Sequence, residues 1–279
     1  MCRFFIYIGE TIKLNKLFKP TNSILKQSIH TPFTPFQMNN QRDHDINGDG
    51  FGICWRKGSK IYFYKSIKPP WNDCNILNLS DYIESDLFLC HIRAVKPFVR
   101  QPCVNEQNCH PFIYKNLSWM HNGQINNKEV LCKYLYDNCS LDLLKHIKGT
   151  TDSEYCFFIF IYLLEKEKIM KNNVLNVPLS IINIMKECIK IIISLVDDIV
   201  SLNFSIYDGT RILCTRYINS NDENPPSLYY SKNLDIGCKN NNIIISSEPI
   251  TINDSEWIII PKNNLILVTD GEIIIEEII

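Results

Sequence analysis

The chain opens with Met1-Cys2-Arg3 and the apolar run Phe4–Ile8, and this stretch decides the fold. The run is rich in aromatic and β-branched residues, so it predicts a strand that buries the N-terminus. Removal of Met1, which is expected before a residue as small as cysteine, leaves Cys2 with both a thiol and a free α-amino group. An α-amino group titrates at about 7.7–8.0 in model peptides, near the pH at which a general base works. Cys2 is therefore a candidate nucleophile with its own base, although many proteins begin Met-Cys by chance.

The composition is that of an ordinary globular protein of 279 residues, with 45% hydrophobic and 21% charged residues. A net charge of −1 gives no field that favours nucleic acid or an anionic membrane. The apolar stretch 179–200 contains five charged residues, which favours an internal helix over a membrane span. Twelve cysteines without a Cys-x-x-Cys pair indicate reduced thiols. We expect a cytoplasmic protein with no nucleic-acid partner and no membrane.

The order of the predicted elements favours an α+β fold. Strands are expected first, at residues 3–8, 50–55, 61–64 and 87–95. Helices follow at 128–136, from 151–154 onward and at 179–200, and seven short strands fill the chain after residue 205. Residues 19–47 and 168–177 are expected to be a long loop and a linker. Strands, then helices, then strands predict a single layered α+β domain over residues 1–279.

The dipeptide Asn122-Gly123 has two interpretations. It is the strongest short signal for a type I′ hairpin turn. It also suits an oxyanion hole, because an asparagine amide and a glycine backbone N–H can point two donors at one developing negative charge. Both interpretations can hold together.

Two charged residues suit the binding of an amino-acid head group. Arg93 follows a predicted strand, where a guanidinium can hold a carboxylate through two hydrogen bonds. Asp152 can accept an ammonium group from the substrate. The structural alternatives are an ordinary ion pair for Arg93 and a helix cap for Asp152.

The sequence gives little support for a metal. His91, His110 and His121 lack the helical spacing of metal ligands and have no accompanying thiol pair, so structural roles are preferred. The stretch Asp43–Gly48 matches the start of an EF-hand loop, but Cys54 stands where a glutamate ligand is required. We expect no metal and no other cofactor.

These motifs resemble the class II glutamine amidotransferases of the N-terminal-nucleophile hydrolase superfamily. The resemblance covers most of the chain and rests on the following segments: Met1-Cys2-Arg3, Asp49–Gly52, His91–Arg93, Asn108, His110–Phe112, His121–Gly123, Thr151–Glu154, Tyr207–Gly209, Thr215–Tyr217, Ser247–Pro249, Trp257 and Pro261. The later segments resemble a stand-alone subfamily. It includes the amidotransferase-like subunit of the fungal glutathione-degrading complex and the γ-glutamyl hydrolase of ergothioneine synthesis. The segment Ala94–Pro97 departs from the pattern of many relatives.

The resemblance implies a four-layer αββα sandwich and assigns roles to residues. Cys2 is implied as the nucleophile, with Asn122 and Gly123 as the oxyanion hole. Arg93 and Asp152 are implied to hold the carboxylate and ammonium of a γ-glutamyl group, with His121 among the substrate-binding residues. The implied reaction is hydrolysis of the γ-glutamyl amide of glutamine or a γ-glutamyl peptide through a thioester.

Three other hypotheses remain open. In the first, the chain is a subunit of a larger complex and is active only with its partner protein. A partner would also be needed for any use of ammonia in synthesis, because the hydrolase domain is expected to end with the chain. Alternatively, it is a catalytically silent module with the same fold. A calcium-binding module is the fourth and weakest hypothesis.

Overall fold

The structure is a computed structural model that describes residues 2–30, 46–94, 105–167, 170–171, 174–175, 178–237 and 241–278. The chain divides into two compact units. Unit 1 comprises residues 1–111 and 226–260, and unit 2 comprises residues 112–225 and 261–279. Asp43–Asp45 of the EF-hand-like stretch, Val95–Pro97 of the departing segment and most of the expected linker lie outside the described residues.

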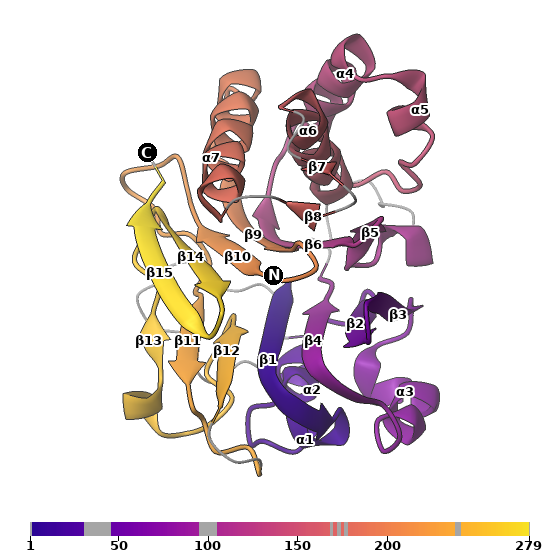
Figure 1. Ribbon diagram of the computed structural model, residues 1–279, viewed down its shortest axis with the longest axis vertical. Coiled ribbons are helices and arrows are strands. Elements are labelled where there is room, and N and C mark those ends of the chain that lie inside the picture. Colours follow the sequence, from indigo (N-terminus) through magenta and orange to yellow (C-terminus); the bar gives the residue numbers. More distant parts are fainter. Residues whose placement is uncertain are drawn as a thin grey trace. The chain divides into compact units, whose positions relative to one another are not determined.

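Unit 1 is built on an antiparallel sheet of seven strands in the order β13-β11-β12-β1-β4-β2-β3 (Figure 1). The strands are β1 (Arg3–Lys13), β2 (Phe51–Lys57), β3 (Lys60–Ser66), β4 (Glu84–Ile92), β11 (Tyr229–Lys232), β12 (Asn242–Ser246) and β13 (Ile258–Ile259). The predicted N-terminal strand is β1, and it lies between β12 and β4. Phe5 of β1 is opposite Ser246 on one side and Cys90 on the other. The start of the chain is therefore held from both sides.

Short helices cover one face of this sheet. They are α1 (Asn15–Phe18), α2 (Ile24–Ile29) and α3 (Cys74–Leu79), with 3-10 turns at Pro70–Asn72, Glu106–Asn108 and Asp254–Glu256. Alternate residues of a strand point to the same face. Phe5 and Tyr7 of β1 thus share one core cluster with Leu14, Leu17 and Ile24 of the helical segment.

Unit 2 contains an antiparallel sheet of six strands in the order β15-β14-β10-β9-β6-β5. The strands are β5 (Phe112–Tyr114), β6 (Leu117–Gln124), β9 (Ser201–Tyr207), β10 (Ile212–Arg216), β14 (Asn264–Thr269) and β15 (Glu272–Glu277). The helices are α4 (Lys128–Asn138), α5 (Leu141–Leu144), α6 (Asp152–Lys166) and α7 (Pro178–Leu195), and β7 (Met170–Lys171) pairs with β8 (Val174–Leu175).

Helix α6 is buried along most of its length, and α7 packs beside it (Figure 1). The ring of Phe157 stacks on Trp119 of β6 with their centroids 5.6 Å apart. This contact anchors α6 on the sheet, so the N-terminus of α6 is fixed relative to β6.

Most predicted elements are present, with shifted ends. The predicted helix 179–200 is α7, which ends at Leu195, and Val200 leads into β9 instead. The strands β5 and β6 were not predicted. The interpretation of Asn122-Gly123 as a hairpin turn is wrong, because both residues lie within β6, opposite Asn203 and Leu202 of β9. Among the described residues, no helix has the length and apolar character needed to cross a membrane.

Candidate active site

The thiol of Cys2 is held at the end of β4. Cys2 directly precedes β1 and is partly exposed. The backbone N–H of Ala94 donates to its Sγ over 3.4 Å, and Sγ lies 3.7 Å from the Ala94 carbonyl oxygen. The register places Arg3 opposite Ile92, so the last residues of β4 run alongside the start of β1. The pairing of two strands thus brings the thiol to a defined position.

Arg93 lies in the same unit, immediately before Ala94. Its backbone is fixed because its N–H donates to Gly50 O over 2.8 Å and its carbonyl accepts from Asp49 N over 3.1 Å. The side chain is only 5% exposed. Its Nη1 is buried and has no hydrogen-bond partner among the residues that the structure describes. A buried cationic donor without a partner is costly, so this guanidinium is suited to bind an anion such as a carboxylate.

The Arg93 charge also acts on a buried thiol nearby. Burial raises the pKa of Cys109 above its ordinary value, and the positive charge of Arg93 partly opposes this shift. Cys109 is fully buried, with Sγ 3.6 Å from the carbonyl oxygens of Ser66 and Asn105. Cys109 is therefore a protonated structural residue, unlike the partly exposed Cys2.

Unit 2 carries the predicted oxyanion residues on β6. Asn122 is fully buried, and Gly123 follows it in the strand. A Cβ added at Gly123 would collide with the Ser201 carbonyl oxygen and with Nε2 of His121. Glycine is therefore required here by the close approach of β9, and not by a turn.

His121 has both ring nitrogens engaged inside unit 2. Nε2 lies 3.1 Å from the Ser201 carbonyl oxygen, and Nδ1 lies 2.9 Å from Ser153 Oγ. A carbonyl oxygen only accepts, so Nε2 carries the proton. Burial lowers the pKa of His121 below the usual value near 6.5, although the Asp152 carboxylate and the Ser201 carbonyl act in the opposite direction. The ring is therefore neutral, and Nδ1 accepts from the Ser153 hydroxyl.

Asp152 is the first residue of α6. Thr151 caps this helix, because its Oγ1 accepts from Glu154 N over 3.2 Å. The Asp152 carboxylate accepts from Ile125 N (3.2 Å) and from Ser153 N (2.8 Å). These two donors orient the carboxylate at the N-terminus of α6. Asp152 is half-buried and is thus a fixed anion with access for a cation.

The six predicted residues form two groups. Cys2 and Arg93 lie together in unit 1, where Arg93 is next to the residue that holds the thiol. The other four, His121, Asn122, Gly123 and Asp152, lie together in unit 2. Ser153 links His121 to Asp152 there, because its hydroxyl lies 2.9 Å from His121 Nδ1 and its backbone N–H donates to Asp152 Oδ1 over 2.8 Å. The sequence showed Ser153 only as a member of the helix-start motif and gave no sign of this link.

The histidines do not assemble a metal site. The rings of His91 and His110 lie against each other with centroids 3.9 Å apart in unit 1, whereas His121 is engaged in unit 2. Within the described part of the chain, no three His, Cys, Asp or Glu side chains are grouped as metal ligands would be.

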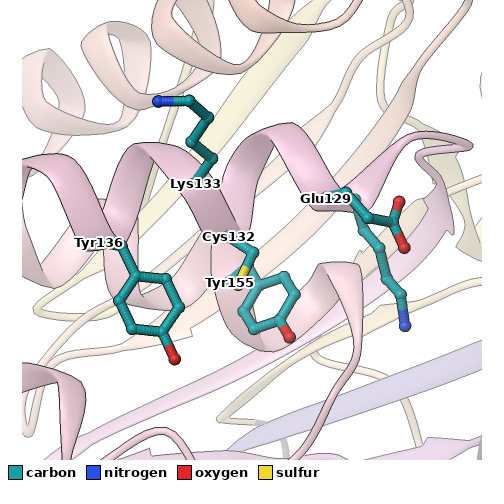
Figure 2. A pocket seen from close by; sticks show the side chains of 6 residues that line it. Glu129, Cys132, Lys133, Tyr136 and Tyr155 are labelled. Atoms are coloured by element: carbon teal, nitrogen blue, oxygen red, sulfur yellow. The ribbon is translucent and has the colours of Figure 1, made fainter.

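A surface hollow of about 400 Å³ lies on the helices of unit 2 and contains none of the predicted site residues. It is lined by Lys128, Glu129, Cys132, Lys133, Tyr136 and Tyr155. Figure 2 shows the side chains of Cys132 and Tyr155 next to each other, with Lys133 pointing away. Burial, together with the Cys132 thiol, raises the pKa of Tyr155 above its ordinary value.

The chain belongs to the class II glutamine amidotransferase family, whose model matches residues 20–215. It is 30% identical over 319 aligned positions to a Saccharomyces cerevisiae protein named "Probable glutamine amidotransferase DUG3". That alignment covers 100% of this chain and 85% of the yeast protein. The family is one of enzymes, in agreement with the sequence prediction.

Solved structures share the fold. A glutamine aminotransferase class-II domain protein from Silicibacter pomeroyi matches 99% of this chain and 98% of its own, with a TM-score of 0.67 and 19% identity. The glutamine phosphoribosylpyrophosphate amidotransferase of B. subtilis matches 100% of this chain and 49% of its own, with a TM-score of 0.62 and 14% identity. The α+β fold of N-terminal-nucleophile hydrolases, expected from the sequence, is confirmed.

Proposed function

We propose that the chain hydrolyses the γ-glutamyl amide of glutamine or of a γ-glutamyl peptide, with Cys2 as the nucleophile. The observation that carries the proposal is the buried Arg93 guanidinium. Its Nη1 has no hydrogen-bond partner among the described residues. Arg93 directly precedes Ala94, whose backbone N–H donates to the Cys2 sulfur. A buried cationic donor on the residue before Ala94 suits a substrate whose carboxylate must be held while its amide is attacked.

In the proposed reaction, Met1 is removed and the freed amine of Cys2 takes the thiol proton. The sulfur then attacks the amide carbon, and an S–C bond forms. Asn122 and the N–H of Gly123 stabilise the resulting oxyanion. The amine returns the proton to the leaving nitrogen, the C–N bond breaks, and a thioester remains. Water then cleaves the thioester, which releases glutamate and restores the thiol.

Arg93 and Asp152 have complementary proposed roles. Arg93 binds the α-carboxylate of the γ-glutamyl group, and Asp152 accepts its α-ammonium. Two backbone N–H groups orient the Asp152 carboxylate before substrate arrives. We further propose that His121 supports Asp152 by holding the Ser153 hydroxyl, since the backbone N–H of Ser153 donates to the Asp152 carboxylate. The whole chain, residues 1–279, acts as one domain in the cytoplasm, where its thiols stay reduced.

A diazo-ketone analogue of glutamine tests the nucleophile. The analogue should add to one thiol with loss of N₂, and peptide mass spectrometry should find the adduct on an N-terminal Cys2. Cys74 is an exposed free thiol and provides the matched control. Cys74→Ala should be labelled like the wild type, whereas Cys2→Ala should not be labelled. Retention of Met1 with no adduct at saturating analogue would refute the proposal.

The alternative is a subunit that is active only with its partner protein, as implied by the resemblance to a subunit of a fungal complex. Activity of the purified chain on a panel of γ-glutamyl substrates separates the two functions. Turnover by the isolated chain supports an independent hydrolase. Labelling at Cys2 without turnover, restored by a co-purifying protein, supports the subunit. The panel also identifies the leaving group.

A further inference from the structure

A buried ion pair lies directly behind the proposed nucleophile. Nε of Arg3 is 2.8 Å from Oε1 of Glu248, and the two side chains are 2% and 0% exposed. Nη1 of the same guanidinium donates to the carbonyl oxygen of Cys2 over 2.9 Å. The Arg3 side chain thus connects the backbone of Cys2 to the Glu248 carboxylate, which lies 245 positions after Arg3 in the sequence.

The segment around Glu248 also holds the backbone that follows Cys2. Phe4 N donates to Ser247 Oγ over 3.0 Å, and Ser247 N donates to the Phe4 carbonyl over 3.0 Å. Ser227 Oγ in turn donates to the Ser247 carbonyl over 2.9 Å. The residue after Arg3 is therefore fixed on both its N–H and its carbonyl side.

Two further buried polar side chains fix this segment from behind. Asn22 donates from Nδ2 to the Pro249 carbonyl over 2.7 Å, and its backbone N–H donates to the Ile250 carbonyl over 3.1 Å. Gln27 Nε2 lies 2.9 Å from the Asn22 carbonyl and 3.4 Å from the Glu248 carbonyl. Asn22 and Gln27 are at most 1% exposed. The backbone around Glu248 is thus held in place by a network of hydrogen bonds.

Stability alone does not account for this arrangement. Removing two charges from water is expensive, and apolar residues of similar size often replace a buried ion pair without loss of stability. The first residues of a chain also tend to be poorly ordered unless they are tied down. A nucleophile, in contrast, must be held within about 0.5 Å of its productive position.

We propose that Arg3 and Glu248 are positioning residues that orient Cys2 for attack. The amine, the Cβ that carries the thiol and the carbonyl of Cys2 all radiate from one Cα. Fixing the carbonyl through Arg3 fixes the peptide plane and the Cα of Cys2, and leaves rotation about the Cα–C bond (ψ) and about χ1. The Ala94 N–H then selects one position for the sulfur. This inference rests on the proposed function of Cys2.

The test uses one variant that removes both charges and one that removes only the charge of Glu248. Arg3→Met/Glu248→Leu replaces the pair with apolar side chains, and Glu248→Gln keeps an acceptor oxygen for Arg3 but removes the negative charge. The matched control is Asp208→Asn, because Asp208 is also 0% exposed and pairs with a buried arginine, Arg211, at 2.7 Å. Each variant is measured for its thermal midpoint, its kcat and KM, and its rate of labelling by the diazo-ketone analogue. Intact mass first verifies that each variant begins at Cys2.

The proposal predicts a loss of rate with little change in substrate binding. A misplacement of about 1 Å costs on the order of 10²-fold in rate. Arg3→Met/Glu248→Leu should therefore fold but lose about that factor in kcat and in the maximal labelling rate, while KM changes less than threefold. Arg3→Lys, which keeps the charge but not the fork of donors, should fall between this variant and the wild type. Asp208→Asn should lower the midpoint and leave the labelling rate unchanged.

Three results would overturn the inference, and they separate a purely structural ion pair from a failure of the proposed function. If Arg3→Met/Glu248→Leu and Glu248→Gln are labelled at the wild-type rate, the ion pair has only a structural role. The same holds if Asp208→Asn slows labelling as much as Glu248→Gln does. If the wild type itself is not labelled at Cys2, the proposed function has failed, and the positioning role fails with it.

Discussion

Substitution of Gly123 by alanine is expected to damage both the sheet of unit 2 and catalysis. The added Cβ would collide with the Ser201 carbonyl oxygen, which belongs to the backbone of β9 and cannot rotate away. It would also collide with Nε2 of His121, which is buried. Relief therefore requires movement of β6 itself, and Asn122 moves with it.

The size of the effect follows from the contact. The strands must separate by on the order of 1 Å to restore van der Waals distances. Overpacking of this kind costs about 1–3 kcal/mol, which lowers the thermal midpoint by roughly 2–12 °C for a chain of this size. A displaced oxyanion donor lowers kcat by about 10²–10³-fold. We expect KM to change less than kcat, because the Arg93 half of the proposed substrate clamp lies in unit 1.

The assay combines thermal unfolding with steady-state hydrolysis of the best substrate from the panel. Gly58→Asn is the control, because Gly58 has a φ of +61°, its Cβ direction is open, and asparagine tolerates this conformation. The control should keep the wild-type kcat. A Gly123→Ala protein with a wild-type midpoint and kcat would refute the argument that β9 excludes a side chain at this position.

Three further predictions concern the start of α6 and its neighbours. Ser153→Ala leaves Nδ1 of buried His121 without its donor, so the free energy of unfolding should fall by about 1–3 kcal/mol in denaturant titrations; an unchanged midpoint would show that another group replaces the hydroxyl. Thr151→Ala should cost about 1 kcal/mol, whereas Thr151→Ser should keep the cap and the stability. His121→Gln should change the pH dependence of stability. Because the pKa of His121 is lowered on folding, the unfolded chain binds more protons as pH falls through about 6.5, and wild-type stability drops with a limiting slope of about 1.4 kcal/mol per pH unit. The variant should lose that part of the slope between pH 7.5 and 5.5, and identical profiles would contradict a neutral, buried ring.

The elements with a strong local pattern could be predicted from the sequence. The run Phe4–Ile8 predicted β1, and the capping motif at Thr151 with the following apolar residues predicted α6. Both patterns depend only on neighbours in the sequence. The strands predicted at residues 50–55 and 61–64 are β2 and β3, which pair with each other.

The missed features depend on contacts between distant residues. Strand β6 contains Ser118, His121 and Asn122, all of which are at most 2% exposed. Polar residues in a strand normally suggest a solvent-facing side, and nothing local shows that these are buried. The pairing of Arg3 with Glu248 likewise follows from the place of β12 next to β1, which no periodicity reveals. The six candidate residues were chosen by residue type and family resemblance, and their assigned roles remain predictions.

The position of β1 between β4 and β12 has a consequence for synthesis of the protein on the ribosome. One neighbour of β1, the strand β4, is synthesised early because it ends at Ile92. The other neighbour, β12, is synthesised late because it ends at Ser246, and Glu248 comes after it. The strand next to Cys2 must therefore wait in an unfinished sheet, with one edge open, until most of the chain has emerged. During that interval Arg3 lacks its contact with Glu248. The proposed nucleophile would thus gain this support only after the late strand is made.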